Sequence, residues 1–320
     1  AGEDVVTCPE YMELFKYTSS LNAERILVNQ SIRFTQPLAF NDPFDSNPFV
    51  KKLYSIEELK ILIDRMFADN RDSFEEVILD SFYNTLEIIY PGSKQLINSE
   101  QLLDFFYSNI EKGPGSISNF VFSKPDDDSF LEKTINHFIQ NVLTQTGVLS
   151  LTTDPRNLLM WAHYGDSHRG IVLEFDGDHP FFDQSDNGIY PKKIETTYSD
   201  ERPKLDFKLE ELSDSDKLFQ GFKSIYFTKS IDWKYEAEYR VIRKLSGDTD
   251  SGVKDVNGFK IHLFPLPKDV LKGIIFGKST PKTNIDSILK IMSDMEYHDI
   301  AVRQIELDEK NYLLKISDCP

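Results

Sequence analysis

Two glutamates, Glu236 and Glu238, lie in a segment that alternates aromatic or apolar residues with charged ones. This segment, residues 233–241, predicts a strand, and the period of two would place both carboxylates on one face. Two carboxylates about 7 Å apart, flanked by rings and cations, are suited to stabilising a sugar-like cation. A half-buried strand with a solvated charged face is the more common meaning of this pattern. The segment alone therefore favours a structural role.

A second group of polar residues alternates with leucines in another predicted strand. Ser150 and Thr152 belong to it, and their hydroxyls either face a cleft or bond to nearby backbone groups. A short aromatic helix is predicted next, over residues 156–164. We expect Trp161 to anchor the core and His163 to be a hydrogen-bonded partner inside it.

The amino-terminal region offers a third set of candidates. Lys16 and Tyr17 end a predicted strand and precede three hydroxyl residues, so the lysine either meets phosphate as a point charge or is solvated at the surface. Asn41 lies in the segment 40–45, where Asn, Asp and Pro stand between two phenylalanines. These residues predict an ordered turn, because Asn and Asp bond their own backbone and Pro fixes φ.

Metal chemistry is an alternative interpretation of the central part of the chain. His163 and His168 stand five residues apart, and Glu174 and Asp176 begin an acidic cluster further along. Imidazole and carboxylate ligands suit Mg²⁺, Mn²⁺ or Zn²⁺. The chain has no H-E-x-x-H or calcium-loop pattern, and it has no phosphate-binding glycine loop or G-x-S-x-G motif. The metal signal is therefore unspecific.

The composition limits the partners. The chain has 320 residues and a net charge of −17, which argues against broad nucleic-acid binding but leaves room for a small nucleotide in a pocket. Residues 229–244 are an exception, with five Lys or Arg against three acids. No apolar run is long enough to span a membrane. Two lone cysteines, Cys8 and Cys319, and an acidic start without an apolar stretch favour a cytoplasmic protein.

Short strands mixed with scattered helices predict an α+β fold. A helical insertion is expected at residues 55–146, between a first part of the core at 1–54 and a second part at 147–320. Strands are expected at 14–17, 31–34, 147–152, 170–175, 189–198, 235–243, 259–264, 271–276, 301–307 and 312–316. Helices are expected in the core at 21–28, 156–164, 205–227 and 284–295.

Several of these segments, in this order, resemble the bacterial domain of unknown function 2971 family. The segments that carry the resemblance are residues 14–17, 40–45, 160–164 with 170–175, the pattern Trp-x-x-Glu-x-Glu-Tyr-Arg at 233–240, and residues 274–277. The combination is specific although each motif alone is weak. This family name implies no activity.

The order of segments is also similar to that of ADP-ribosyltransferase folds, which implies a mixed or antiparallel sheet core and NAD as substrate. By this resemblance Glu238 would bond the 2′-hydroxyl of the nicotinamide ribose and stabilise an oxocarbenium-like transition state. Glu236 would orient or deprotonate the acceptor, and the ring of Tyr164 or Tyr17 would stack on nicotinamide. The residues expected to bind NAD are Lys16, Tyr17, Asn41, Ser150, Thr152 and Arg240. The chain departs from those folds in having Lys rather than Arg or His on the first strand, and Ser-Leu-Thr rather than Ser-Thr-Ser.

The leading hypothesis is therefore an ADP-ribosyltransferase-like enzyme that uses NAD, with a small dinucleotide and an unidentified acceptor macromolecule as its partners. Such an enzyme would fit a toxin or phage-defence effector. One alternative is a metal-dependent hydrolase or nuclease that uses Glu174, Asp176 and the two histidines. The other is a non-enzymatic module that binds a nucleotide or a protein partner.

Overall fold

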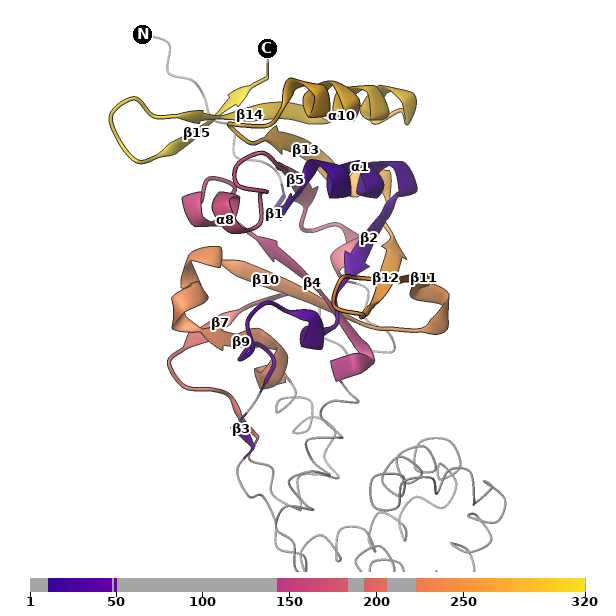
Figure 1. The fold of residues 1–320 in the computed structure, drawn as a ribbon, viewed down its shortest axis with the longest axis vertical. Coiled ribbons are helices and arrows are strands. Elements are labelled where there is room, and N and C mark those ends of the chain that lie inside the picture. The colour runs from indigo at the N-terminus through magenta and orange to yellow at the C-terminus, as the bar shows by residue number, and fades with distance from the viewer. Residues whose placement is uncertain (1–10, 48, 51–142, 184–192, 206–222, 320) are drawn as a thin grey trace, which may run out of the picture. The chain divides into compact units, whose positions relative to one another are not determined.

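Figure 1 shows the computed structural model, which describes residues 11–47, 49–50, 143–183, 193–205 and 223–319. The chain divides into two compact units, one formed by residues 1–47, 142–203 and 224–320 and the other by 48–141 and 204–223. The second unit holds most of the expected insertion and of the expected helix at 205–227, and these predictions lie almost entirely outside the described residues. In that unit β3 (Phe49–Val50) pairs in parallel with β8 (Lys204–Leu205).

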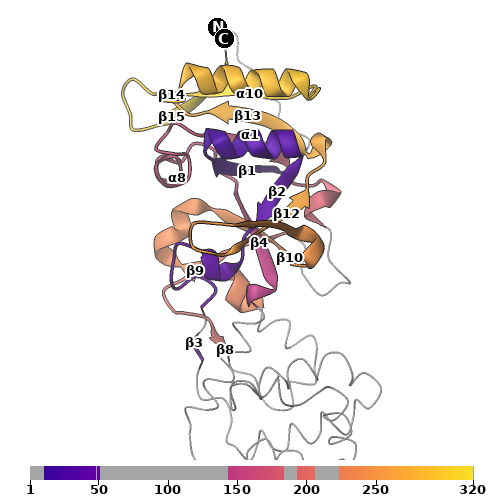
Figure 2. The same cartoon turned by 45° about the vertical axis from the view of Figure 1, so that its right-hand side comes forward.

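The first unit is built on an eight-stranded sheet with the order β15-β14-β13-β5-β1-β4-β10-β6 (Figure 2). Its strands are β1 (Glu13–Thr18), β4 (Thr146–Thr152), β5 (Ile171–Asp176), β6 (Ile194–Glu195), β10 (Glu238–Lys244), β13 (Leu271–Phe276), β14 (Ala301–Leu307) and β15 (Leu314–Asp318). Within this eight-stranded sheet, β13 and β14 are the only described neighbours that pair in parallel. The sheet is therefore mixed and mostly antiparallel, and the prediction of an α+β fold is confirmed.

Smaller elements surround this sheet. A three-stranded sheet has the order β11 (Asp250–Lys254), β12 (Lys260–Pro265), β2 (Ser31–Phe34), and β7 (Thr197–Ser199) pairs with β9 (Thr228–Ser230). The α-helices described over their whole length are α1 (Ser20–Asn29), α8 (Leu158–His163) and α10 (Lys282–Asp294), and residues 223–227, the end of the helix expected at 205–227, are helical as well. The 3₁₀ turns are η1 (Pro37–Ala39), η2 (Pro180–Phe182), η5 (Ile231–Glu236), η6 (Gly247–Thr249) and η7 (Lys268–Val270). No described helix is both long and apolar enough to cross a membrane.

The helices begin where the sequence supplies a cap. The Ser19 hydroxyl accepts a hydrogen bond from the Asn22 amide and starts α1, while the Asn157 side chain accepts from the Leu159 amide and starts α8. The apolar residues of α10 recur at helical spacing, with Ile285, Ile288 and Met292 buried in the core. Figures 1 and 2 both show α1 and α10 lying side by side.

The sheet divides between β1 and β4. Strand β1 pairs with β5 over six residues, but with β4 only at Phe15 and Thr152. The other edge of β4 pairs with β10 over seven residues. In addition, the amides of Val148 and Thr35 each donate a hydrogen bond to the carbonyl of the other residue, both at 2.9 Å. Across the gap, Lys16 Nζ donates to the Ser150 carbonyl at 3.3 Å. The two halves of the sheet therefore meet at the Phe15–Thr152 pair and diverge from there. As a result, side chains of β1 and β4 face a common space.

The prediction of one strand over residues 233–241 is wrong in its first half. The chain forms the turn η5, passes through Ala237 in the left-handed region (φ 42°), and enters β10 only at Glu238. Two local interactions override the alternating pattern. The Ser230 hydroxyl caps η5 by accepting from the Asp232 amide, and the turn carries Glu236 into a buried ion pair.

Gly170 is required by close backbone packing where β5 begins. A Cβ atom at this position would lie 2.3 Å from the Thr18 carbonyl oxygen and 2.8 Å from the Gly165 carbonyl oxygen. We expect Gly170→Ala to reduce the free energy of unfolding by about 2–3 kcal/mol, because backbone on both sides must move. Chemical denaturation measures the loss. Gly247→Ala is the control, since its Cβ would meet no atom within 4 Å; equal stability of the two variants would contradict the prediction.

Candidate functional site

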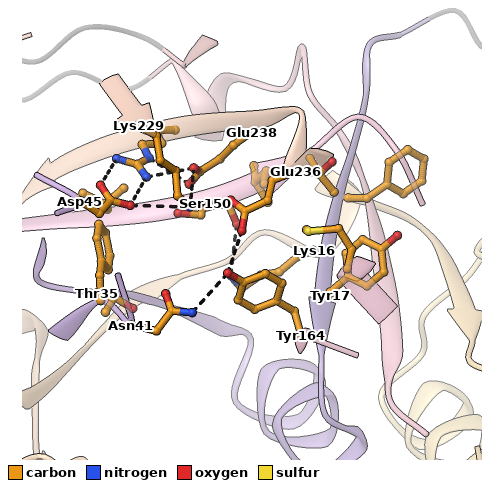
Figure 3. Close-up of a pocket in the computed structure, with 17 residues that line it drawn as sticks. Lys16, Tyr17, Thr35, Asn41, Asp45, Ser150, Tyr164, Lys229, Glu236 and Glu238 are labelled. Atoms are coloured by element: carbon orange, nitrogen blue, oxygen red, sulfur yellow. Dashed lines mark hydrogen bonds and ion pairs between the residues drawn. The ribbon is translucent and has the colours of Figure 1, made fainter. Parts of the chain in front are cut away.

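A cavity of about 200 Å³ lies where β1 and β4 diverge (Figure 3). Its walls come from β1, β4, β9, η5 and β10, from the residue after β2, from α8 and the residue after it, and from the turn after η1. The lining residues are Phe15, Lys16, Tyr17, Thr35, Phe40, Asn41, Asp45, Val148, Ser150, Leu151, Thr152, Met160, Tyr164, Lys229, Glu236, Glu238 and Arg240. All nine residues selected from the sequence as site candidates are among them.

Arg240 is the buried centre of the polar wall, with 1% of its surface exposed. Its guanidinium forms two hydrogen bonds with Glu238, both at 2.9 Å, and two with Asp45, at 2.8 and 2.6 Å. A fifth bond goes to the Tyr226 carbonyl at 2.6 Å. Paired bonds of this kind fix both carboxylates in position and orientation. Arg240 therefore borders the cavity mainly as the residue that positions Glu238.

Lys229 connects the two glutamates. Its ammonium lies 2.5 Å from Glu236, 3.5 Å from Glu238 and 3.7 Å from Asp45, and 6% of its surface is exposed. Burial by itself would lower the pKa of Lys229, but the three carboxylates outweigh it and raise the pKa. The lysine is therefore a permanent cation inside this group.

The two glutamates differ in their protonation. Burial opposes ionisation of Glu238, yet Arg240 and Lys229 outweigh it, and the Ser150 hydroxyl adds a hydrogen bond; together they lower the pKa of Glu238 to about 2. Burial dominates at Glu236 and raises its pKa in spite of Lys229. Glu238 is therefore a fixed anion, whereas Glu236 is able to exchange a proton.

Glu236 is also oriented from the opposite side of the cavity. The Tyr164 hydroxyl donates to Glu236 Oε1 at 2.7 Å, and the Asn41 amide donates to the same hydroxyl at 3.4 Å. Figure 3 shows this series of hydrogen bonds, which runs from Asn41 in the turn after η1 through Tyr164 to Glu236 in η5. The predicted partners Tyr164, Asn41 and Glu236 thus lie within one hydrogen-bonded series.

The β1 residues take different positions. Tyr17 is buried, donates its hydroxyl to the Asp154 carbonyl at 2.8 Å, and packs edge-on against Trp161 with ring centroids 5.1 Å apart. Trp161 is fully buried, which confirms it as a core anchor. Lys16 is half-buried, and burial lowers its pKa to about 8. Lys16 is therefore the β1 residue with a polar group available to the cavity.

Sequence reasoning missed three contributors to this site: Asp45, Lys229 and Tyr198. The Glu238 amide donates to the Tyr198 hydroxyl at 2.8 Å, which holds the backbone of the glutamate. Asp45 stood within the turn recognised at 40–45 but was assigned no role beyond it. A buried arginine in a strand requires carboxylate partners. Arg240 was therefore the sequence signal from which a carboxylate partner such as Asp45 could have been inferred.

One expectation about the surroundings is wrong. His163 is exposed, with Nδ1 3.0 Å from the Tyr235 hydroxyl, rather than inside the core. The positive stretch at 229–244 presents little charge to solvent, because Lys229, Arg240 and Arg243 are all buried. Arg243 bonds the Phe181 carbonyl and lies 4.3 Å from the Phe181 ring centre.

The candidate metal ligands are not grouped around a metal site. No three His, Cys, Asp or Glu residues in the described ranges are arranged to hold a metal ion. Glu174 is buried and is engaged by Arg303 at 2.6 Å and by the Tyr11 hydroxyl at 2.9 Å. The histidines at 163 and 168 contact aromatic rings instead.

Residues 160–241 match the family model described as protein of unknown function (DUF2971). The DUF2971 match covers Tyr164, Glu236, Glu238 and Arg240, while the residues from β1, the 40–45 turn and β4 lie before it. No curated protein and no solved structure matches the chain significantly.

Proposed function

We propose that the protein is an ADP-ribosyltransferase-like enzyme that cleaves NAD in this cavity and transfers ADP-ribose to an acceptor. One observation carries the proposal: a fixed anion, Glu238, and a proton-exchanging carboxyl, Glu236, line the same cavity and share Lys229. A pair of carboxyls with separated pKa values is a common basis for acid–base chemistry at a sugar carbon.

The charge balance of the wall suits this reaction. Asp45, Glu236 and Glu238 supply three negative charges against two positive charges on Lys229 and Arg240, so the buried group has an excess of one negative charge when Glu236 is ionised. When the bond between ribose and nicotinamide breaks, the bonding electron pair stays on the ring nitrogen. Nicotinamide therefore leaves as a neutral molecule, and the sugar becomes a cation. Fixed negative charge in a partly water-excluded cavity stabilises that cation.

The acceptor step needs a base. A hydroxyl, amine or water that attacks the ribose carbon forms the new bond and releases a proton, and Glu236 is the carboxylate that would receive it. Its raised pKa brings it closer to the operating range of a general base than an exposed glutamate. If the acceptor is a macromolecule, modification of that partner would fit a toxin or phage-defence effector.

The size of the cavity indicates how NAD would bind. Pockets that enclose drug-sized ligands measure about 300–1,000 Å³, so 200 Å³ encloses one part of a dinucleotide. We assign that part to nicotinamide and its ribose, with Tyr164 beside the ring and the 2′-hydroxyl directed to Glu238. The Ser150 and Thr152 hydroxyls offer further hydrogen bonds, and Lys16 offers a cation to the adjacent phosphate. We also propose that the divided sheet is an ADP-ribosyltransferase fold.

The test is incubation of the protein with NAD, followed by chromatographic measurement of free nicotinamide. The proposal expects release with multiple turnovers, and more release when the acceptor is added. Absence of both release and NAD binding would contradict it. Binding without release would favour the alternative of a non-enzymatic nucleotide-binding module.

The hydroxyl of Tyr164 should set the pH dependence of this reaction. Glu236 accepts a proton only when ionised, so the rate should rise as pH rises through its pKa. Tyr164 stabilises the ionised form by its 2.7 Å bond, so Tyr164→Phe should move the midpoint of the rise upward by about one pH unit. Tyr239→Phe is the control, since its hydroxyl bonds the exposed Glu195. A midpoint that stays or falls in Tyr164→Phe would argue against Glu236 as the base.

A further inference from the structure

The three cations that line the cavity are not equivalent. Lys229 and Arg240 are held by carboxylates, but no Asp or Glu in the described part of the chain lies within ion-pair distance of Lys16. The hydrogen bond of Lys16 goes to a neutral group, the Ser150 carbonyl, at 3.3 Å. Within the described residues, its amine thus lines the cavity with no carboxylate at ion-pair distance, and Glu238 acts on it only from further away.

The position of Lys16 makes the neutral form of its amine more accessible than in an ordinary lysine. It is half-buried on β1 between Phe15 and Tyr17, and burial, assisted by the charge of Arg33 and opposed by that of Glu238, lowers the pKa of Lys16 to about 8. At a pH equal to this pKa, half of the Lys16 amine is unprotonated, compared with under about 1% of the amine of an ordinary lysine of pKa near 10.4. An unprotonated amine is a nucleophile, and desolvated lysines serve as imine-forming residues.

We propose that Lys16 is a covalent capture site for small planar aldehydes, which its amine binds as an imine inside this cavity. The amine nitrogen forms a bond to the carbonyl carbon, and the carbonyl oxygen leaves as water with the two amine protons, so no oxidant or reductant is required. The aromatic walls at Phe40 and Tyr164 suit a flat ligand, and 200 Å³ limits it to a single ring. The capture step itself consumes no NAD.

The experiment uses the full chain, salicylaldehyde as the probe and cyanoborohydride to reduce the imine to a stable amine. Peptide mapping by mass spectrometry then measures the adduct at each lysine. We expect at least tenfold more adduct at Lys16 than at Lys282, whose side chain is 79% exposed. Lys16→Arg, which keeps the charge but removes the nucleophile, should lose the preferred adduct, whereas Lys282→Arg should retain it.

The map of the wild-type protein decides the question even if Lys16→Arg folds poorly. Adducts distributed according to exposure, with Lys16 at or below the level of Lys282, would overturn the proposal. Preferred labelling that persists at another residue of the cavity in Lys16→Arg would overturn it as well, because the amine would then not be the capturing group. Nicotinamide release plays no part in either outcome.

Discussion

Replacing Glu238 by Gln should reduce nicotinamide release from NAD by about 10²–10³-fold. Removal of one fixed electrostatic group from a preorganised site commonly has this effect. Glu238 is the carboxylate with the lowered pKa, near 2, and it is held by two bonds from Arg240. The amide keeps the shape of the side chain but removes the charge that would stabilise the cationic sugar. Initial rates at saturating NAD measure the effect.

Two controls separate chemistry from folding in this variant. Glu195→Gln removes an exposed carboxylate from β6, the strand beside β10, and should leave the rate within about twofold of the wild type. A thermal melt of Glu238→Gln shows whether the fold persists, because Arg240 loses part of its pairing. Rates that fall equally in both variants, or remain unchanged in Glu238→Gln, would contradict the role assigned to Glu238.

Arg240→Met should lower the free energy of unfolding by about 3–5 kcal/mol at pH 7. The substitution removes five hydrogen bonds from a buried site and leaves Glu238 and Asp45 with Lys229 as their remaining described cation. Removal of one partner from a buried charge group strands the others without compensation. Urea denaturation followed by circular dichroism measures the loss.

The pH dependence of this loss provides a second check. The lowered pKa of Glu238 means that its contribution to stability is present above its ordinary value of 4.5 and disappears as pH falls towards 2. The difference between wild type and Arg240→Met should therefore shrink over that range. Lys260→Met is the matched control, because the Lys260–Asp250 pair lies 2.7 Å apart with the lysine side chain 60% exposed, and should cost under about 1 kcal/mol. Similar losses in the two variants would contradict a structural role for the buried arginine.

Much of the core follows from local patterns in the sequence. The predicted strand at 271–276 and that at 301–307 have the observed bounds of β13 and β14, and the ordered turn at 40–45 is confirmed by the 2.9 Å bond from the Phe44 amide to Asp42. Periodicity, caps and turn residues act over a few neighbours, so they can be recognised without the fold.

The arrangement of charges could not be predicted in this way. Asp45 and Arg240 are 195 positions apart in the chain, and their pairing depends on how the 40–45 turn meets β10. The short-range ion pair between Lys229 and Glu236 forms in the turn η5, where the alternating pattern predicted a strand. Lys229 was counted only as part of a locally positive stretch, because the sequence does not show that three carboxylates surround it. The proposed domain division at residues 54 and 146 stays a prediction.

A crystal structure of the protein with a non-cleavable NAD analogue, in which carbon replaces the ring oxygen of the nicotinamide ribose, would show whether this cavity binds NAD. We predict the ribose 2′-hydroxyl about 3 Å from a Glu238 oxygen and the nicotinamide ring beside Tyr164, in the space between β1 and β4. An analogue bound elsewhere on the protein, or a cavity that stays empty at saturating analogue, would contradict this prediction.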